Sequence, residues 1–196
     1  MASTAAPYGL RPVNMLGGQV MTHGIRLYKI SSGYASNIFN GDLVSLVVGG
    51  TIEKNTGTTT ATPVGVFVGC EYEDAAMGLL HRQYWPSGTT PKANTTAWAY
   101  VVDDPDALFE IQADDTLGQN AIGTNAAIVQ GTGSTATGNS AVALDASTIA
   151  GTGTLPLRIV DYVKRPGFSE LGDAYTDVIV RINTHFNRAV AGNAAS

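Results

Sequence analysis

The sequence has few of the residues that binding chemistry and catalysis usually need. Its 196 residues include one cysteine, three histidines and only 11 lysines and arginines, and the formal net charge is -5. A single cysteine excludes an internal disulfide and a zinc site built from cysteines. The missing basic excess argues against direct binding of nucleic acid, because phosphates attract a positive field. We therefore expect no nucleic-acid partner.

Catalytic and metal-binding motifs are also missing. His23, His81 and His185 have no HxH or HxxxH spacing that would direct two imidazoles at one metal, so we interpret them as surface or interface residues. No GxSxG motif is present, and no lysine follows the glycines of GTGSTATG as in a phosphate-binding loop. The DDPD cluster at 103–106 and the pair Asp114–Asp115 lack the closing Glu of a calcium loop, which favours turns. The sequence predicts a protein that is not an enzyme and has no cofactor.

Long apolar runs do not occur either. The stretch LVSLVVGG at 43–50 is far shorter than the roughly 20 residues that a membrane-spanning helix needs. The beginning of the chain, MASTAAPYGLRPVNMLGGQ, lacks the basic region and unbroken apolar segment of a signal peptide. We expect that the protein is made in a cytoplasm and does not associate with a membrane.

What the sequence has is the composition of β-structure. Gly accounts for 23 residues, and Thr, Val and Asn are plentiful. Short β-compatible segments recur, separated by Gly, Asn and Asp turns, which predicts an all-β fold with a single barrel or sandwich domain. The predicted strands span 24–30, 42–48, 64–72, 80–85, 97–103, 107–113, 125–130, 155–164 and 177–186. Residues 73–83 are equally compatible with a short helix or with a loop that leads into a strand.

Alternation within these segments predicts which side chains are buried. In the 64–72 strand, Val64, Val66, Val68, Cys70 and Tyr72 share one face, so we expect Cys70 to be a small buried hydrophobic residue. In the last strand, one face should be core and the other should be wet or at an interface; the two faces are Val178, Val180, Ile182 and Phe186 against Ile179, Arg181, Asn183 and His185. The DDPD turn should join its flanking strands as a hairpin-like pair.

The ends of the chain differ from its middle. Residues 1–23 hold prolines and glycines but also apolar side chains, which indicates an extended arm that lies on a neighbouring subunit or, alternatively, on its own domain. Deletion of residues 2–18 should leave the barrel, the β-rich domain of residues 24–186, folded. Residues 130–154 form a Gly/Ser/Thr-rich segment that we interpret as a long surface loop with room for one short strand, and residues 187–196 as a flexible tail. The predicted contact residues of the arm are Tyr8, Leu10, Val13, Met15 and Leu16.

Several segments together resemble the capsid decoration or cement proteins of tailed bacteriophages, especially marine and cyanobacterial phages. The segments are APYGLRPVNMLGGQ, GYASNIFNGDLVSL, TGTTTATPVGVFVGCEY, QYWPSG, VVDDPDALFEIQ and GDAYTDVIVRIN, which span nearly the whole chain. The resemblance implies a β-rich protein, usually trimeric, made in the host cytoplasm and located on the outer surface of the virion capsid. There it would clamp junctions between major capsid protein subunits, and deletion of residues 2–18 should weaken its attachment to the capsid. The resemblance carries no catalytic residues.

A second hypothesis is a carbohydrate-binding or hydrolytic β-sandwich on the virion surface. Tyr84, Trp85, Trp98 and Tyr100 could form a platform on which sugars stack. Against this, Trp98 and Tyr100 share one face of a strand and are more simply explained as core residues.

Overall fold

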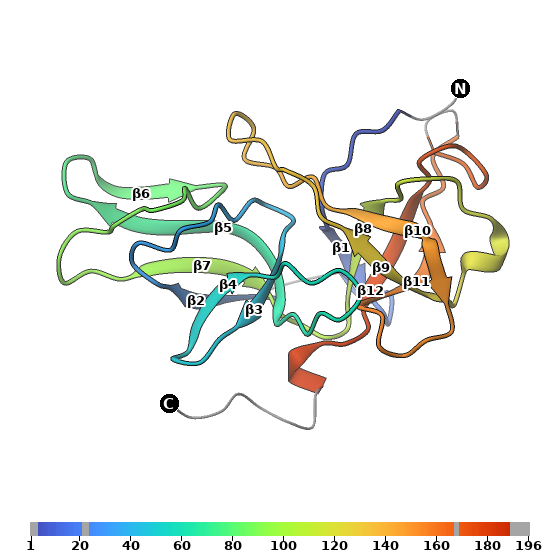
Figure 1. Ribbon diagram of the computed structural model, residues 1–196, viewed down its shortest axis with the longest axis horizontal. Helices are drawn as coiled ribbons and strands as arrows, with labels where there is room; N and C mark the ends of the chain where they lie inside the picture. The colour runs from blue at the N-terminus through green and yellow to red at the C-terminus, as the bar shows by residue number, and fades with distance from the viewer. Residues whose placement is uncertain (1–3, 21–23, 167–168, 189–196) are drawn as a thin grey trace.

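The computed structural model describes residues 4–20, 24–166 and 169–188, and the regular secondary structure of these residues is almost entirely β-strand (Figure 1). The all-β prediction is confirmed. The strands build a closed five-stranded barrel and a second sheet, which lie side by side in Figure 1. Every strand predicted from the sequence overlaps an observed one.

The barrel is formed by the strand ring β3–β4–β2–β7–β5, closed by pairing of β3 with β5, and β6 extends it beside β5. Phe67 and Trp85 are fully buried in its interior. Small residues on β7, Ala97 and Ala99, leave room for these large rings. The strands are β2 (Ile25–Ile30), β3 (Leu43–Leu46), β4 (Thr51–Lys54), β5 (Gly65–Asp74), β6 (Gly78–Arg82) and β7 (Ala97–Val102).

The second sheet is antiparallel, with the order β1-β8-β12-β11-β9-β10. It curls until β10 approaches β8, where Ala113 and Leu144 form an isolated bridge. Its concave face carries a second core that includes Phe109, Ile111 and Val180. The strands are β1 (Arg11–Met15), β8 (Ala107–Gln112), β9 (Asn125–Val129), β10 (Ala143–Ala150), β11 (Leu157–Tyr162) and β12 (Asp177–Ile182).

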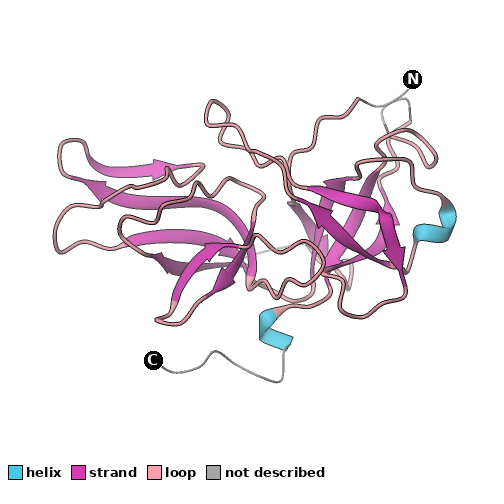
Figure 2. Cartoon of the chain, viewed as in Figure 1, coloured by secondary structure: helices cyan, strands magenta, loops and turns pink. Residues whose placement is uncertain are grey.

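Helical structure in the described residues is limited to two short 3₁₀ turns, Gln119–Ala121 and Phe186–Arg188, and Figure 2 shows loops and strands everywhere else. The segment 73–83 contains the β5–β6 hairpin, so the helical alternative is wrong there. Gly78 adopts a positive φ of 76° at the end of the hairpin turn, a conformation that glycine permits and that interrupts a helix.

The core of the second sheet extends into the barrel at the junction of the two halves. Leu43, Val66 and Val102 of the barrel belong to the same buried cluster as the second sheet. Gly9 lies between the halves with φ 76°, and a Cβ there would stand only 2.7 Å from the carbonyl oxygen of Gly41. The N–H of Gly9 donates a hydrogen bond to the carbonyl of Val142, and the N–H of Leu10 donates to the carbonyl of Gly41. These two bonds hold the backbones at this short distance.

The N-terminal segment therefore contributes to the fold of its own chain. Leu10 is fully buried, and β1 pairs with β8 at the edge of the second sheet. An edge position tolerates Pro12, which has no N–H, and the register shifts between Pro12 and Asn14. The expectation that the domain stays folded after deletion of residues 2–18 is disfavoured, because this deletion removes a paired strand and a core leucine.

Two connections also differ from their predictions. The strands on either side of the DDPD turn are not a hairpin pair, because β7 pairs with β2 and β5 of the barrel whereas β8 pairs with β1 and β12. The turn is the crossover between the halves. The segment 130–154 does not stay on the surface: Ser140 and Val142 are buried at the junction, and β10 is eight residues long. Of the predicted tail, Asn187 and Arg188 lie in a 3₁₀ turn, and residues 189–196 are outside the described part of the chain.

Candidate functional site

The described residues contain no group of three or more His, Cys, Asp or Glu side chains that could hold a metal ion. Cys70 is buried as predicted, and burial raises its pKa to about 12, so it is not a nucleophilic thiolate. His81 is exposed, with Nδ1 3.4 Å from a Glu71 carboxylate oxygen. His23 lies outside the described residues.

His185 contradicts the prediction of a wet surface residue. It is only 1% exposed, whereas Phe186 is half-buried, because β12 ends at Ile182 and the alternation stops there. Its Nδ1 accepts a hydrogen bond from the backbone N–H of Asn187, and burial lowers its pKa. The surrounding segment attaches the end of the second sheet to the barrel, since the N–H of Phe186 donates to the carbonyl of Pro63.

The most concentrated group of polar side chains lies on the outer face of the second sheet. The Tyr8 hydroxyl donates to Glu110 Oε1 at 2.9 Å and lies 3.1 Å from Asp177 Oδ1. Arg165 holds Glu110 with two bonds of 2.9 and 2.8 Å, and the Arg11 guanidinium stacks 4.0 Å above the Tyr8 ring. Burial is the main cause that raises the pKa of Tyr8 far above its usual value.

This cluster is a latch for the N-terminal segment and does not form an open carboxylate pair. Tyr8 covers the two carboxylates, and Glu110 is only 5% exposed. Gln112 extends the latch, since it accepts a bond from the N–H of Ala6 at 2.7 Å. A glycosidase would need its two carboxylates to face a substrate across a cleft, and here the side chain of Tyr8 occupies the space between them.

Replacing Asp177 with Asn should make the protein more stable at neutral pH. Burial, and then the nearby Glu110 carboxylate, raise the pKa of Asp177, although the Tyr8 hydrogen bond opposes the shift. A carboxyl with a raised pKa in the folded state weakens folding once it ionises, so the gain from Asn should disappear as the pH falls below about 4. Thermal unfolding of both proteins across this range checks the prediction.

The matched control is Asp115→Asn, because Asp115 is an exposed carboxylate that follows β8, the strand paired with β12 at Asp177. Its substitution should change stability little at any pH. An Asp177→Asn protein that is less stable at neutral pH, or whose gain does not depend on pH, would contradict the interpretation of the latch.

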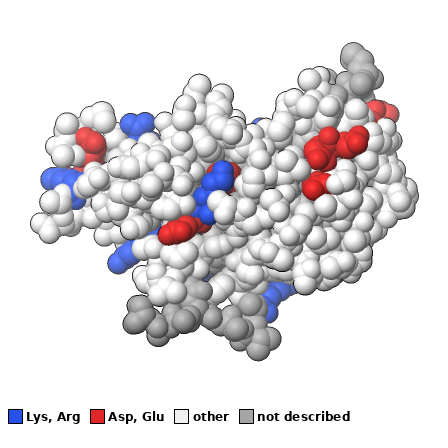
Figure 3. Space-filling view, viewed as in Figure 1, with Lys and Arg blue, Asp and Glu red and all other residues white. Residues whose placement is uncertain are grey.

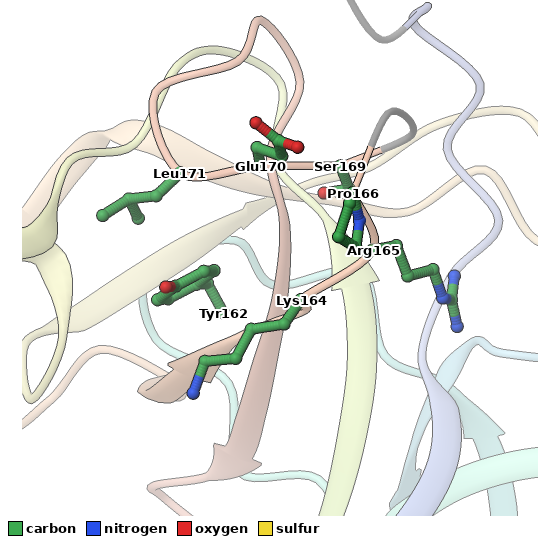
Figure 4. Close-up of a pocket in the computed structure, with 7 residues that line it drawn as sticks. All are labelled: Tyr162, Lys164, Arg165, Pro166, Ser169, Glu170 and Leu171. Atoms are coloured by element: carbon green, nitrogen blue, oxygen red, sulfur yellow. The ribbon is translucent and has the colours of Figure 1, made fainter.

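A pocket of about 340 Å³ lies beside the latch, in the loop after β11 (Figure 4). The side chains of Tyr162 and Lys164 lie on the same side of the loop, whereas the Arg165 side chain extends away from Tyr162. Lys164 pairs with Asp161 at 3.1 Å and Arg165 with Glu110, so both cations already have partners within the chain. These contacts favour a structural role for this loop.

The aromatic side chains are placed differently from the sequence prediction. Trp85 is fully buried and contacts Tyr72 in the barrel, and Tyr84 stacks on Phe39. Trp98 and Tyr100 are not core residues: they are half-buried on the outer face of β7, because the inward positions belong to the alanines and Val101. The four aromatics therefore do not form one platform.

The five predicted contact residues do not share one exposed surface. Leu10 is fully buried and Tyr8 belongs to the latch, while Val13 and Met15 are half-buried on β1. Leu16 is 43% exposed. Of the five, Leu16 has the most apolar surface to offer a partner.

Leu16 belongs to a group of exposed apolar side chains whose other members were not predicted from the sequence. We call Leu16, Val20, Ile25 and Leu27 the N-terminal patch; their exposed fractions are 43%, 74%, 52% and 47%. Leu16 and Ile25 flank the DDPD turn, since Leu16 lines a hollow with Asp106 and Ile25 lines another with Asp103 and Asp104. The structure thus places two of these exposed apolar side chains, Leu16 and Ile25, at the crossover between the halves.

Charge does not define any comparable surface in the view of Figure 3, where charged side chains form separate spots on an otherwise uncharged face. The described residues include no helix long and apolar enough to cross a membrane.

Comparisons with known proteins give no match: no family model fits the chain, and neither the curated proteins nor the solved structures contain a significant relative. Any proposal about function must therefore be argued from the sequence and the geometry.

Proposed function

We propose that this protein is a structural component of a tailed-bacteriophage virion, which binds the outer surface of the capsid and stabilises contacts between major capsid protein subunits. The observation that carries the proposal is the N-terminal patch. Large apolar side chains gathered on a surface mark sites of contact with other macromolecules, and Val20 alone is 74% exposed. The resemblance of the sequence to phage decoration proteins supplies the kind of partner.

The fold around the patch favours binding over catalysis. Leu27 is on β2 of the closed barrel, and Leu16 follows directly after β1, with its N–H bonded to the carbonyl of Asp106 at 2.8 Å. Side chains held by paired strands lose little conformational freedom on binding, which leaves more of the contact energy as affinity. The protein would act by binding, without turnover.

A cement protein gains most when it binds several subunits at once. We propose a symmetric homo-oligomer, with a trimer as the expected form, because closed symmetry is the rule for homo-oligomers. Linked copies raise the overall affinity roughly 10²–10⁴-fold over that of a single copy. Direct contact with the packaged DNA is not part of the proposal, since the chain has only 11 basic side chains.

The test compares DNA-filled expanded shells with and without the purified protein. A ligand that binds the intact shell but not its free subunits stabilises it by about 2.7 kcal/mol per site at a hundredfold excess over Kd. Shells that carry the protein should therefore release DNA at a higher temperature than bare shells. Identical release curves would contradict the cementing role even if the protein binds.

A second candidate is the binding of glycans, and the outward position of Trp98 and Tyr100 favours it. Lys29, Trp98 and Glu71 are direct neighbours across β2, β7 and β5, so an aromatic face lies between a cation and a carboxylate. Such a row offers stacking and hydrogen bonds to a sugar. Incubation of the isolated protein with an array of glycans distinguishes the two candidates, because a cement protein should bind none.

A further inference from the structure

The strand β6 has an open edge. It pairs with β5 through an unbroken register from Cys70–Arg82 to Asp74–Gly78, and it is the last strand in its sheet. Backbone groups at alternate positions of such a strand point away from its neighbour. No backbone bond from residues 78–82 to another described segment fills that side. Leu79, the second residue of this strand, is 63% exposed.

Other terminal strands among the described residues are protected, and this contrast makes β6 informative. The edge of β1 contains Pro12 and a register shift, both of which obstruct further pairing. The edge of β10 is bridged to β8, where the N–H of Asp114 bonds to the carbonyl of Leu144. β6 contains no proline and no bulge, the loop at Gly138 and Asn139 contacts Gln83 just beyond its end, and the neighbouring Met77 is also 63% exposed.

We propose that the β6 edge is an interaction surface for a second copy of this chain, which adds its own β6 in antiparallel orientation about a two-fold axis at Leu80. In this register Leu80 faces Leu80 of the other copy, Leu79 faces His81, and Gly78 faces Arg82. The two barrels would then share one continuous sheet across the axis. The inference is independent of the proposed capsid function.

Charge complementarity supports a second copy as the occupant. On β6 and β5, Arg82, Gly78 and Asp74 share one face, because Asp74 pairs with Gly78 and Arg82 pairs with Cys70. Across the two-fold axis, the Arg82 side chain would extend over Gly78 of the other copy, where no atom lies within 4 Å of a Cβ position, towards Asp74. The two strand spacings to Asp74 amount to about 10 Å, which the two side chains can bridge together.

The Nε of Arg82 is buried and has no hydrogen-bond partner among the described residues, and the Arg82 charge already acts on Asp74 of the same chain. The reciprocal Asp74 carboxylate is held in place by the N–H groups of Ala76 and Met77, at 2.8 and 2.9 Å. The two-fold axis would form this ion pair twice, while Leu79 and Met77 of both copies leave water.

Sedimentation of Leu79→Lys tests the proposal, because an exposed lysine on an edge strand opposes strand addition. The matched control is Val48→Lys, since Val48 is 55% exposed in the β3–β4 turn. We expect the wild type and the control to form assemblies with twice the copy number of Leu79→Lys at high protein concentration. An equal copy number in all three proteins would overturn the proposal.

The register is tested by disulfide formation between copies. Chains with Leu79→Cys should cross-link to chains with His81→Cys, and neither should cross-link efficiently to itself, because only facing positions bring the Cα atoms within the 7 Å that a disulfide allows. The native Cys70 is buried and should not compete. Absence of the mixed cross-link overturns the two-fold pairing. If Leu79→Lys loses shell binding but keeps its copy number, the edge serves the capsid and not a second copy.

Discussion

Replacing Asp42 with Ala should lower the free energy of unfolding by about 3–5 kcal/mol, the usual effect of breaking a buried ion pair. The Asp42 side chain is fully buried and lies 3.0 Å from Lys54 Nζ. It also accepts hydrogen bonds from the Ser140 hydroxyl at 2.6 Å and the N–H of Phe39 at 2.8 Å. The substitution leaves an ammonium, a hydroxyl and an amide without their acceptor, each of which costs free energy when buried. Calorimetric unfolding gives the measurement.

A matched control for this prediction is Asp161→Ala. Asp161 pairs with Lys164 at 3.1 Å, almost the same distance, but the two side chains are 45% and 64% exposed. Exposed ion pairs contribute about 0–1 kcal/mol, because water replaces them. Equal losses in the two variants would show that burial of Asp42 does not decide its contribution.

Asp42 also links the two halves of the protein. Its partner Ser140 comes from the segment between β9 and β10, so a barrel residue anchors a loop of the second sheet. That loop is rich in Gly, Ser and Thr, and its composition alone predicted a flexible surface excursion. Composition describes the freedom of an isolated segment, whereas tertiary hydrogen bonds between residues 98 positions apart decide where it lies.

The strands were predictable where alternation and turn residues agree, as in β7 and β12, because period-two burial is a local property of the sequence. The strand β4 was missed because its four residues, TIEK, are too short for a periodic signal. The pairing of β7 and β8 was wrong for a different reason. The residues of the DDPD segment predict a turn, but they do not determine whether the strand after the turn pairs with the strand before it. That pairing depends on how the strands pack in the whole fold.

The strand β5 shows how one bulge changes a face. The sequence placed Val66 and Cys70 on one side and Phe67 on the other. In the structure Phe67 and Cys70 share the barrel interior, whereas Val66 packs in the core of the second sheet. The register shifts between Phe67 and Gly69, where Gly69 has a φ of 153°. A bulge inserts one extra residue and so moves every later side chain to the opposite face.

The candidate site was less predictable than the fold. The latch joins Tyr8 to Asp177 across 169 positions and could not be found from local spacing. The apolar character of the N-terminal segment predicted contact residues that include the exposed Leu16. It could not separate Leu10, which is buried, from Leu16, which is exposed, since the two differ only in what the rest of the chain places beside them.

Replacing Leu16 and Leu27 together with Ser should weaken binding to the capsid shell by roughly three- to tenfold for each side chain. Full burial of a leucine contributes about 1.5–3 kcal/mol; less than half of each side chain remains exposed, which leaves about 0.7–1.4 kcal/mol, and each 1.4 kcal/mol is a tenfold change in Kd. Both side chains are nearly half exposed, at 43% and 47%, so the free protein should stay folded with little change in stability. Co-sedimentation with expanded shells over a range of protein concentrations gives the two dissociation constants.

The control for this prediction is Val48→Ser, which removes an apolar side chain of similar exposure, 55%, from the β3–β4 turn of the barrel. If the N-terminal patch is the contact surface, Val48→Ser should bind shells like the wild type, because its position is separate from the crossover between the halves. Equal weakening in both variants would mean that binding depends on general surface hydrophobicity. Unchanged binding of the double variant would remove the patch from the contact and, with it, the observation on which the proposed function depends.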